Sequence, residues 1–259
     1  MKEPKVFLVG ETRENGQGLR DYLDHIGVPY WAHTKPSLND AELLIEVMGR
    51  LCYKSFEVGL NPNVTKIRES SADYLANIIK VKHGSVLEHA SFSFIFADVS
   101  RVFTHELVRH RVGTAMSQES LRFVRLEEID GWIPSCVRED TYAMEIFRST
   151  FEELGSLQKL LGAAFNIDGL PFSEKKKITS AMRRLAPLGL PTTIGWTANV
   201  RTLRWVLEMR THPSAEEEIR LVFGEVGRIM KEKCPNLFAD YEVEEVDGLD
   251  WYRTESGKV

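Results

Sequence analysis

The chain of 259 residues contains only three cysteines, Cys52, Cys136 and Cys234. They are odd in number and far apart, which excludes a disulfide framework and any CxxC metal or redox motif. None of them lies in a recognisable nucleophile context, so each is interpreted as a buried or incidental thiol. The sequence therefore does not favour an enzyme that works through a cysteine thiolate.

Glycine-rich phosphate loops and long apolar runs are also missing. The sequence contains neither GxGxxG nor a Walker loop, so a Rossmann dehydrogenase and a P-loop enzyme are both unsupported. No apolar run is long enough to span a bilayer. The N-terminal MKEPKVFLVGE has a short apolar run between charges, which is unlike a signal peptide. We therefore expect a cytoplasmic protein with no membrane partner.

The net charge is negative, but positive charge is concentrated in one stretch. The formal net charge is -5 and the pI is near 5.9, which argues against a broad nucleic-acid surface. Residues 100–125, SRVFTHELVRHRVGTAMSQESLRFVR, nevertheless hold five arginines and two histidines. Arginines at a helix end can simply complement the helix dipole. Their density here favours a site for an anionic ligand.

The pattern within this stretch predicts a helix, a loop and a strand. Ser100 is a good N-cap for a helix to about Arg111, which places the RHR triplet 109–111 in the last turn. Successive helical residues differ by about 100°, so the three side chains cannot all bind one small group. The strand predicted for SLRFVRL puts Ser120 and Arg122 on one face, where a hydroxyl and a guanidinium can grip a phosphate or carbonyl.

A metal site is rejected on spacing. His83 and His89 are six residues apart, and His105-Glu106 begins like HExxH but has Arg109 where the second histidine belongs. His89 is instead interpreted as a hydrogen-bonded core histidine.

The rest of the chain alternates strands with helices, which predicts an α/β fold. The acidic and then polar tail after Tyr241 is expected to be loosely held, and no linker divides the chain. The expected strands cover 5–9, 92–96, 121–126 and 192–200, and the expected helices cover 18–25, 39 or 40 to 53, 66–82, 100–111, 140–165, 173 to before Pro187, 200–210 and 215–233.

RHR, a short loop and Ser-x-Arg together resemble the signature of the flavin-dependent thymidylate synthases. The blocks HGSVLEHASFSF, Tyr53 with Ser55, NVRTLRWVLEMR and AEEEIR resemble further family motifs in the family's order, and the similarity covers residues 51–241. The resemblance implies one domain over 1–259, with 1–50 as an N-terminal extension packed on it and 242–259 as a loose tail. It also implies a mixed sheet flanked by helices and a homotetramer with sites at subunit junctions.

The resemblance implies a reaction in which dUMP, methylenetetrahydrofolate and NADPH give dTMP through bound FAD, without an enzyme nucleophile. Ser120 is then a hydrogen-bond donor. Ser120 and Arg210 are the implied catalytic residues, and Arg183 reaches the nucleotide from a neighbouring subunit. The implied nucleotide-binding residues are Glu106, Arg109, Gln118, Glu119, Ser120, Arg122, Arg183 and Arg210. The implied flavin and folate residues are Ser55, His83, Ser85, Arg109, His110, Arg111, Asn199 and Arg201.

The chain departs from the family pattern in a few places. Eight residues rather than seven separate Arg111 from Ser120, so 114–117 cannot be matched one by one. Phe123 stands where tyrosine is usual in the family, Glu106 where glutamine is frequent, and Trp205 where a small polar residue or histidine is common. His212 lies two residues before the position of a further family histidine, which is Ser214 here.

Two other functions stay open, namely a related flavoenzyme that alkylates another pyrimidine nucleotide and a non-catalytic nucleotide- or nucleic-acid-binding protein.

Overall fold

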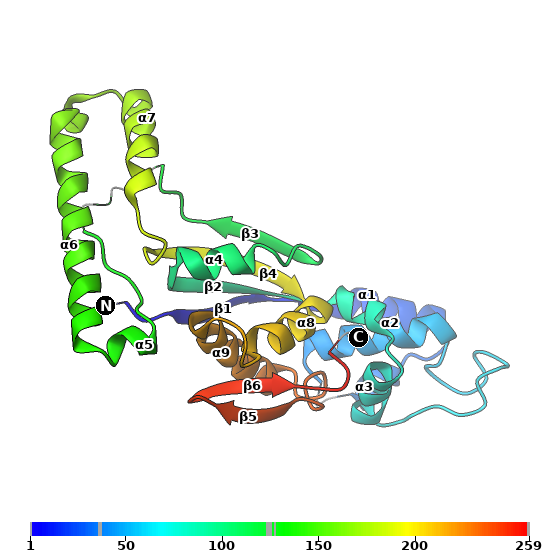
Figure 1. Ribbon diagram of the computed structural model, residues 1–259. Helices are drawn as coiled ribbons and strands as arrows, with labels where there is room; N and C mark the ends of the chain where they lie inside the picture. The colour runs from blue at the N-terminus through cyan, green and yellow to red at the C-terminus, as the bar shows by residue number, and fades with distance from the viewer. Residues whose placement is uncertain (1, 36–37, 123–125, 127, 258–259) are drawn as a thin grey trace. The chain divides into compact units, whose positions relative to one another are not determined.

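The computed structural model describes residues 2–35, 38–122, 126 and 128–257 (Figure 1). Its strands are β1 (Lys5–Glu11), β2 (Ser91–Ser100), β3 (Thr114–Gln118), β4 (Pro191–Asn199), β5 (Glu242–Val246) and β6 (Leu249–Arg253). Its α-helices are α1 (Gly16–His25), α2 (Asp40–Tyr53), α3 (Ser71–Lys80), α4 (Arg101–Leu107), α5 (Ser135–Arg138), α6 (Thr141–Ala164), α7 (Phe172–Met182), α8 (Val200–Thr211) and α9 (Glu217–Lys233). Short 3-10 helices are η1 (Trp31–Thr34), η2 (Gly84–His89), η3 (Ile167–Gly169) and η4 (Arg183–Leu185).

A four-stranded sheet has the strand order β1-β2-β4-β3. On β2 the aromatic side chains at alternate positions, Phe92, Phe94 and Phe96, are buried, as their period of two predicts. The strands pair antiparallel. The α/β class is thus confirmed, with an antiparallel rather than a mixed sheet. Among the described residues, none of the helices combines the length and the apolar character that crossing a membrane requires.

The chain forms two compact units. Unit 1 comprises residues 1–7, 95–110 and 116–195, and unit 2 comprises residues 8–94, 111–115 and 196–259. That all 259 residues act as one domain, with 1–50 as an extension, stays a prediction.

Unit 1 is built around the long helix α6, which lies beside α7 (Figure 1). Asp140 caps α6, because its Oδ1 accepts the Ala143 N–H at 2.9 Å, and the helix lies within the range 140–165 expected from the sequence. The Gln158 amide of α6 donates to the Met182 carbonyl at the end of α7. A hydrophobic core of this unit consists of Leu126, Ile129, Ile133, Phe151 and Leu190.

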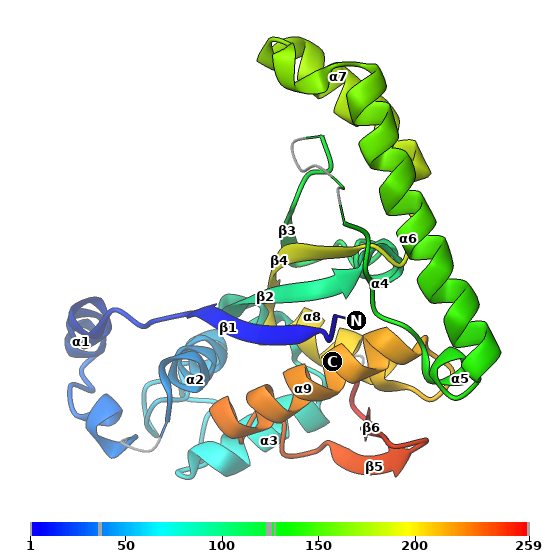
Figure 2. The same ribbon diagram turned by 90° about the vertical axis from the view of Figure 1, so that its left-hand side faces the viewer.

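Unit 2 packs α8 and α9 together and places the β5–β6 hairpin against both (Figure 2). The hairpin corrects the expectation of a loosely held tail. Asp247 and Gly248 form its two-residue turn with φ of 56° and 73°, and Tyr252 is buried. An Asp-Gly pair between two short strands is a strong hairpin signal that the acidic composition obscured.

Several boundaries differ from expectation because tertiary contacts decide them. The helix predicted over 66–82 is α3, which starts after the N-cap Ser70. Helix α7 starts at Phe172 after Pro171, so Ser173 is not its cap. Strand β3 occupies the predicted loop. In the strand predicted over 121–126, Leu121 and Arg122 form a turn, and Phe123 and Val124 lie outside the described residues.

Candidate active site

The arginine-rich stretch begins as predicted but its helix ends early. Ser100 Oγ accepts the Phe103 N–H at 3.1 Å and caps α4. Helix α4 ends at Leu107, and the N–H of His110 bonds to the Leu107 carbonyl in the turn that follows. The RHR triplet therefore follows the helix instead of forming its last turn, and the argument from helical angles does not apply. Arg109 is exposed and His110 is half-buried.

The segment after β3 is fastened to β4 inside unit 1. The Glu119 N–H donates to the Thr193 carbonyl at 2.9 Å, and the Thr193 N–H donates to Glu119 Oε2 at 3.2 Å. Two residues on, the Arg122 N–H lies 3.4 Å from Ser120 Oγ. A turn, and not a strand face, therefore brings the predicted Ser120 and Arg122 together.

Arg101 joins this segment, although sequence reasoning did not select it. Its Nη2 donates to the Glu119 carbonyl at 3.1 Å, and its buried Nε has no hydrogen-bond partner among the residues that the structure describes. Burial lowers the pKa of Arg101, Glu119 raises it in part, and the charge of Arg183 lowers it further. Two guanidinium groups and one carboxylate thus share a neighbourhood in unit 1. No local pattern marks Arg101, because only the fold brings it to Glu119 and Arg183.

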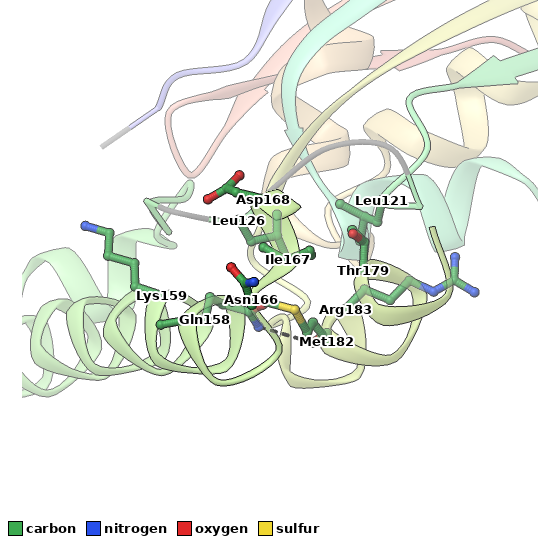
Figure 3. Close-up of a pocket in the computed structure, with 12 residues that line it drawn as sticks. Leu121, Leu126, Gln158, Lys159, Asn166, Ile167, Asp168, Thr179, Met182 and Arg183 are labelled. Carbon is green, nitrogen blue, oxygen red and sulfur yellow. Dashed lines mark hydrogen bonds between the residues drawn. The ribbon is translucent and has the colours of Figure 1, made fainter. Parts of the chain in front are cut away.

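Arg183 also borders a cavity of about 510 Å³ in unit 1 (Figure 3). Figure 3 shows the Arg183 side chain at one edge and Lys159 and Asp168 at the opposite one, with Ile167 and Leu126 between them. The walls come from α6, η3, α7 and residues 121 and 126. The neighbouring Arg184 bonds to the Ser180 carbonyl at 3.0 Å.

In unit 2, the loop 111–115 is anchored on the first turn of α8. The N–H of Asn199 donates to the Gly113 carbonyl at 3.0 Å, and the Thr202 hydroxyl donates to the Val112 carbonyl at 2.8 Å. Asn199 also caps α8, since its Oδ1 accepts the Thr202 N–H at 2.9 Å. Gly113 has φ of 69°, and a Cβ there would clash with Asn199 Nδ2 and the Thr202 hydroxyl. Only glycine allows the backbone to come this close to Asn199, and this contact fixes the segment next to Arg111.

The HGSVLEH block reaches the same helix end. The Val200 N–H donates to the Ala90 carbonyl at 2.9 Å, and Arg201 Nη1 lies 2.5 Å from Glu88 Oε1. His83 and Ser85 are exposed. His89 is exposed too, which corrects the expectation of a core histidine, because η2 turns it away from the buried Val86 and Leu87.

His83 stacks on Tyr53, and Ser55 is bonded to α2, in the same unit. The Tyr53 and His83 rings stack with centroids 5.9 Å apart and an interplanar angle of 16°. The Ser55 N–H donates to the Arg50 carbonyl at 3.0 Å. Arg210 lies half-buried on α8, one turn before the contact of His212 Nδ1 with Ser214 Oγ at 2.7 Å.

The predicted site residues thus separate between the two units. The nucleotide residues lie in unit 1 except Arg210, and the flavin and folate residues lie in unit 2 except Arg109 and His110. Within residues 2–35, 38–122, 126 and 128–257, no three His, Cys, Asp or Glu side chains form a group that could hold a metal ion.

Comparison with known proteins identifies the family of the chain. Residues 33–236 match the family model described as thymidylate synthase complementing protein. A Corynebacterium glutamicum protein named flavin-dependent thymidylate synthase is 35% identical over 212 residues, which cover 79% of this chain and 81% of the relative. Proteins of the same name from Corynebacterium efficiens and Mycobacterium tuberculosis are 36% and 37% identical over 208 and 207 residues, covering 79% and 77% of this chain and 81% and 79% of the relatives. The expectation from the motifs is therefore confirmed, and the chain belongs to the thymidylate synthase complementing protein family, the family of the flavin-dependent thymidylate synthases.

Proposed function

We propose that the protein is a cytoplasmic FAD-dependent thymidylate synthase, which methylates dUMP to dTMP with methylenetetrahydrofolate as carbon donor and NADPH as reductant. The observation that carries this proposal is the similarity to relatives named flavin-dependent thymidylate synthase over 79% of the chain. The positions of the site residues support it independently, because cationic and hydroxyl groups gather in each unit.

The donor groups of unit 2 fit a flavin dinucleotide. Arg111 and Arg201 are exposed guanidinium groups, and Ser55, Ser85 and His83 add hydrogen-bond donors. Guanidinium groups bind diphosphate oxygens strongly, and hydroxyl and imidazole groups can donate to ring carbonyls. When bound, FAD would supply the hydride that reduces the pyrimidine substituent. The residues of this chain would orient the ring and neutralise the diphosphate.

The groups of unit 1 fit a nucleoside monophosphate. Arg122 and Ser120 lie within one turn, and Arg101 bonds the neighbouring Glu119 carbonyl. Arg183 would add a cation to the nucleotide site of a neighbouring subunit. Arg109, Gln118, Glu119 and Glu106 would then bind the base and ribose. Donors of this kind stabilise the negative charge that develops on the pyrimidine carbonyls during methylation, and they need no proton transfer to do so.

The three thiols suit a reaction without a cysteine nucleophile. Burial raises the pKa of Cys234 to about 12, so this thiol stays protonated at neutral pH. Cys52 and Cys136 are exposed on α2 and α5. We propose that none of them attacks the pyrimidine ring.

Exposed apolar side chains of unit 1 support the proposed homotetramer. Tyr142 and Leu160 on α6 are 74% and 66% exposed, and Phe172 on α7 is 70% exposed. Surfaces of this kind commonly mark protein–protein contacts. Light scattering after size exclusion measures the assembly directly.

The decisive experiment is tritium release from dUMP labelled at C5, with FAD, NADPH and methylenetetrahydrofolate each omitted in turn. We expect release that requires all three. Release from labelled UMP or dCMP but not from dUMP would instead favour a flavoenzyme for another pyrimidine nucleotide. A folded protein that binds dUMP and releases no tritium under any condition would favour a non-catalytic binder.

A further inference from the structure

A buried ion cluster in unit 2 lies beside the segment that carries Ser55. The side chains of Arg50 and Glu46 on α2 are 1% and 0% exposed, and Arg50 Nη2 lies 2.7 Å from Glu46 Oε1. Lys35 Nζ approaches the same oxygen at 3.4 Å. Buried charges are tolerated only where further hydrogen bonds satisfy them, so the remaining partners of this cluster show what it holds in place.

Those partners are backbone carbonyls of the segment between α2 and α3. Arg50 Nη1 donates to the Ser55 carbonyl and Nη2 donates to the Arg68 carbonyl, both at 2.7 Å. Lys35 Nζ donates to the Glu69 carbonyl at 2.7 Å. A single guanidinium therefore ties both ends of residues 54–70, a connection with neither helix nor strand.

Tyr74 on α3 completes the support of Ser55. Its ring centroid lies 4.2 Å from the Arg50 guanidinium carbon, so the ring packs against the group that bonds the Ser55 carbonyl. Burial is the largest influence on the Tyr74 hydroxyl and raises the pKa of Tyr74 to about 12. The hydroxyl stays neutral at physiological pH. The backbone of Ser55 is thus held by Arg50, and the guanidinium of Arg50 is held by Tyr74.

We propose that Arg50 and Tyr74 are positioning residues for the flavin site. They hold Ser55 in the orientation in which its side chain meets FAD, and they act through Ser55 instead of touching the cofactor. The inference rests on the proposed function, because that function assigns Ser55 to FAD. Arg50 sets the path of the chain at Ser55, and Tyr74 holds the guanidinium of Arg50 in place.

A double-mutant cycle on the full-length protein tests the part of Tyr74, with FAD as the probe and flavin fluorescence as the readout. We expect Ser55→Ala to weaken FAD binding about 10-fold by the loss of one hydrogen bond, and Tyr74→Leu about 5-fold by the loss of the aromatic ring that packs on Arg50. The double variant should bind no more weakly than Ser55→Ala alone, because Tyr74 acts through Arg50 and Ser55. At saturating FAD, Tyr74→Leu should also alter the visible circular dichroism of the bound flavin, which a mere loss of stability would not do.

Arg50→Lys tests the backbone clamp, since lysine keeps the charge and cannot bond both carbonyls. Its matched control is Arg204→Lys in the same unit, where an equally buried arginine bonds the Leu237 carbonyl and Asp240. With both variants shown to be folded by far-UV circular dichroism, Arg50→Lys should weaken FAD binding at least about 10-fold, and Arg204→Lys less than about 2-fold. If Arg50→Lys does not fold, the cycle with Tyr74 and Ser55 decides.

Two results would overturn the inference while leaving the proposed function intact. One is a Tyr74→Leu effect that is the same with and without Ser55, and the other is an equal loss in Arg50→Lys and Arg204→Lys. The inference would also be overturned if the Arg50 and Tyr74 variants bound FAD as tightly as the wild-type protein. A wild-type protein that binds no FAD would overturn the proposed function and this inference together.

Discussion

Arg201 Nη1 and Glu88 Oε1 lie 2.5 Å apart, and both side chains are nearly half exposed. The pair joins the HGSVLEH block to the first turn of α8. Since Arg201 is an expected ligand of the FAD diphosphate, Glu88 competes with that ligand for the guanidinium. We predict that Glu88→Gln tightens FAD binding about 2- to 3-fold at low ionic strength, and that the gain disappears in high salt. Fluorescence titration at two salt concentrations measures it.

The control for this prediction is Glu225→Gln, which removes a carboxylate from the exposed Arg228 at a similar distance on α9. FAD affinity should not change there. Weaker FAD binding in Glu88→Gln would contradict competition and show that the carboxylate orients Arg201.

Gly113 gives a second prediction, because the cost of its positive φ and the cost of the missing space around a Cβ can be measured separately. Gly113→Ala places a Cβ against Asn199 and Thr202 at a φ of 69°. Gly248→Ala meets a similar φ of 73° with nothing within 4 Å. We expect a loss of about 3 kcal/mol in the free energy of unfolding for Gly113→Ala and about 1 kcal/mol for Gly248→Ala. Urea unfolding measures both, and equal losses would mean that the loop yields to the methyl group.

Local signals in the sequence predicted two helix starts well. Ser100 caps the helix expected of it, and Asn39 caps the helix expected to begin at 39 or 40, because a cap is a bond between one side chain and a backbone N–H three residues away. Local signals did not predict where α4 ends, or that residues 114–118 form a strand. Strand β3 is the sheet neighbour of β4, about 80 residues later in the chain.

In the site too, features that depend on neighbouring residues were predicted, and features that depend on contacts between distant residues were not. The arginine density pointed to the right stretch, and motif order identified the family. Arg101 was missed because only its contacts with Glu119 and Arg183 make it notable. The supporting bonds of Arg50 to residues 55 and 68 leave no trace in spacing or composition either.

Asp240 provides a pH-dependent prediction. Burial alone raises the pKa of Asp240, but hydrogen bonds and charge from Arg204, with the Thr254 hydroxyl, outweigh burial and leave the pKa below its ordinary value. Stability from such a group is present above the unfolded-state pKa of about 3.9 and is lost as pH falls through the folded-state pKa. Asp240→Asn should therefore cost about 3 kcal/mol at pH 7 and progressively less below about pH 4.

Chemical denaturation at pH 7 and at pH 3 measures this difference. Asp247→Asn is the control, because Asp247 is 80% exposed and lies 3.8 Å from Arg220. Its effect should stay within about 0.5 kcal/mol at both pH values. An Asp240→Asn deficit that does not shrink in acid would mean that lost packing, and not lost charge, destabilises the variant.

Arg183 and Arg184 are adjacent in sequence and differ in surroundings, which yields the last prediction. Arg183 lies beside Arg101, whereas Arg184 bonds the Ser180 carbonyl. Arg183→Gln should weaken dUMP binding at least about 10-fold by removing one charge-assisted contact, and Arg184→Gln less than about 2-fold, as measured by calorimetry. The proposed role across subunits adds a sharper readout. At subsaturating dUMP, oligomers mixed from Arg183→Gln and Arg122→Gln subunits should be more active than either variant alone, because a subunit with intact Arg122 can then receive Arg183 from its neighbour. Mixed oligomers that are no more active than their parents would place Arg183 and Arg122 in the site of the same subunit.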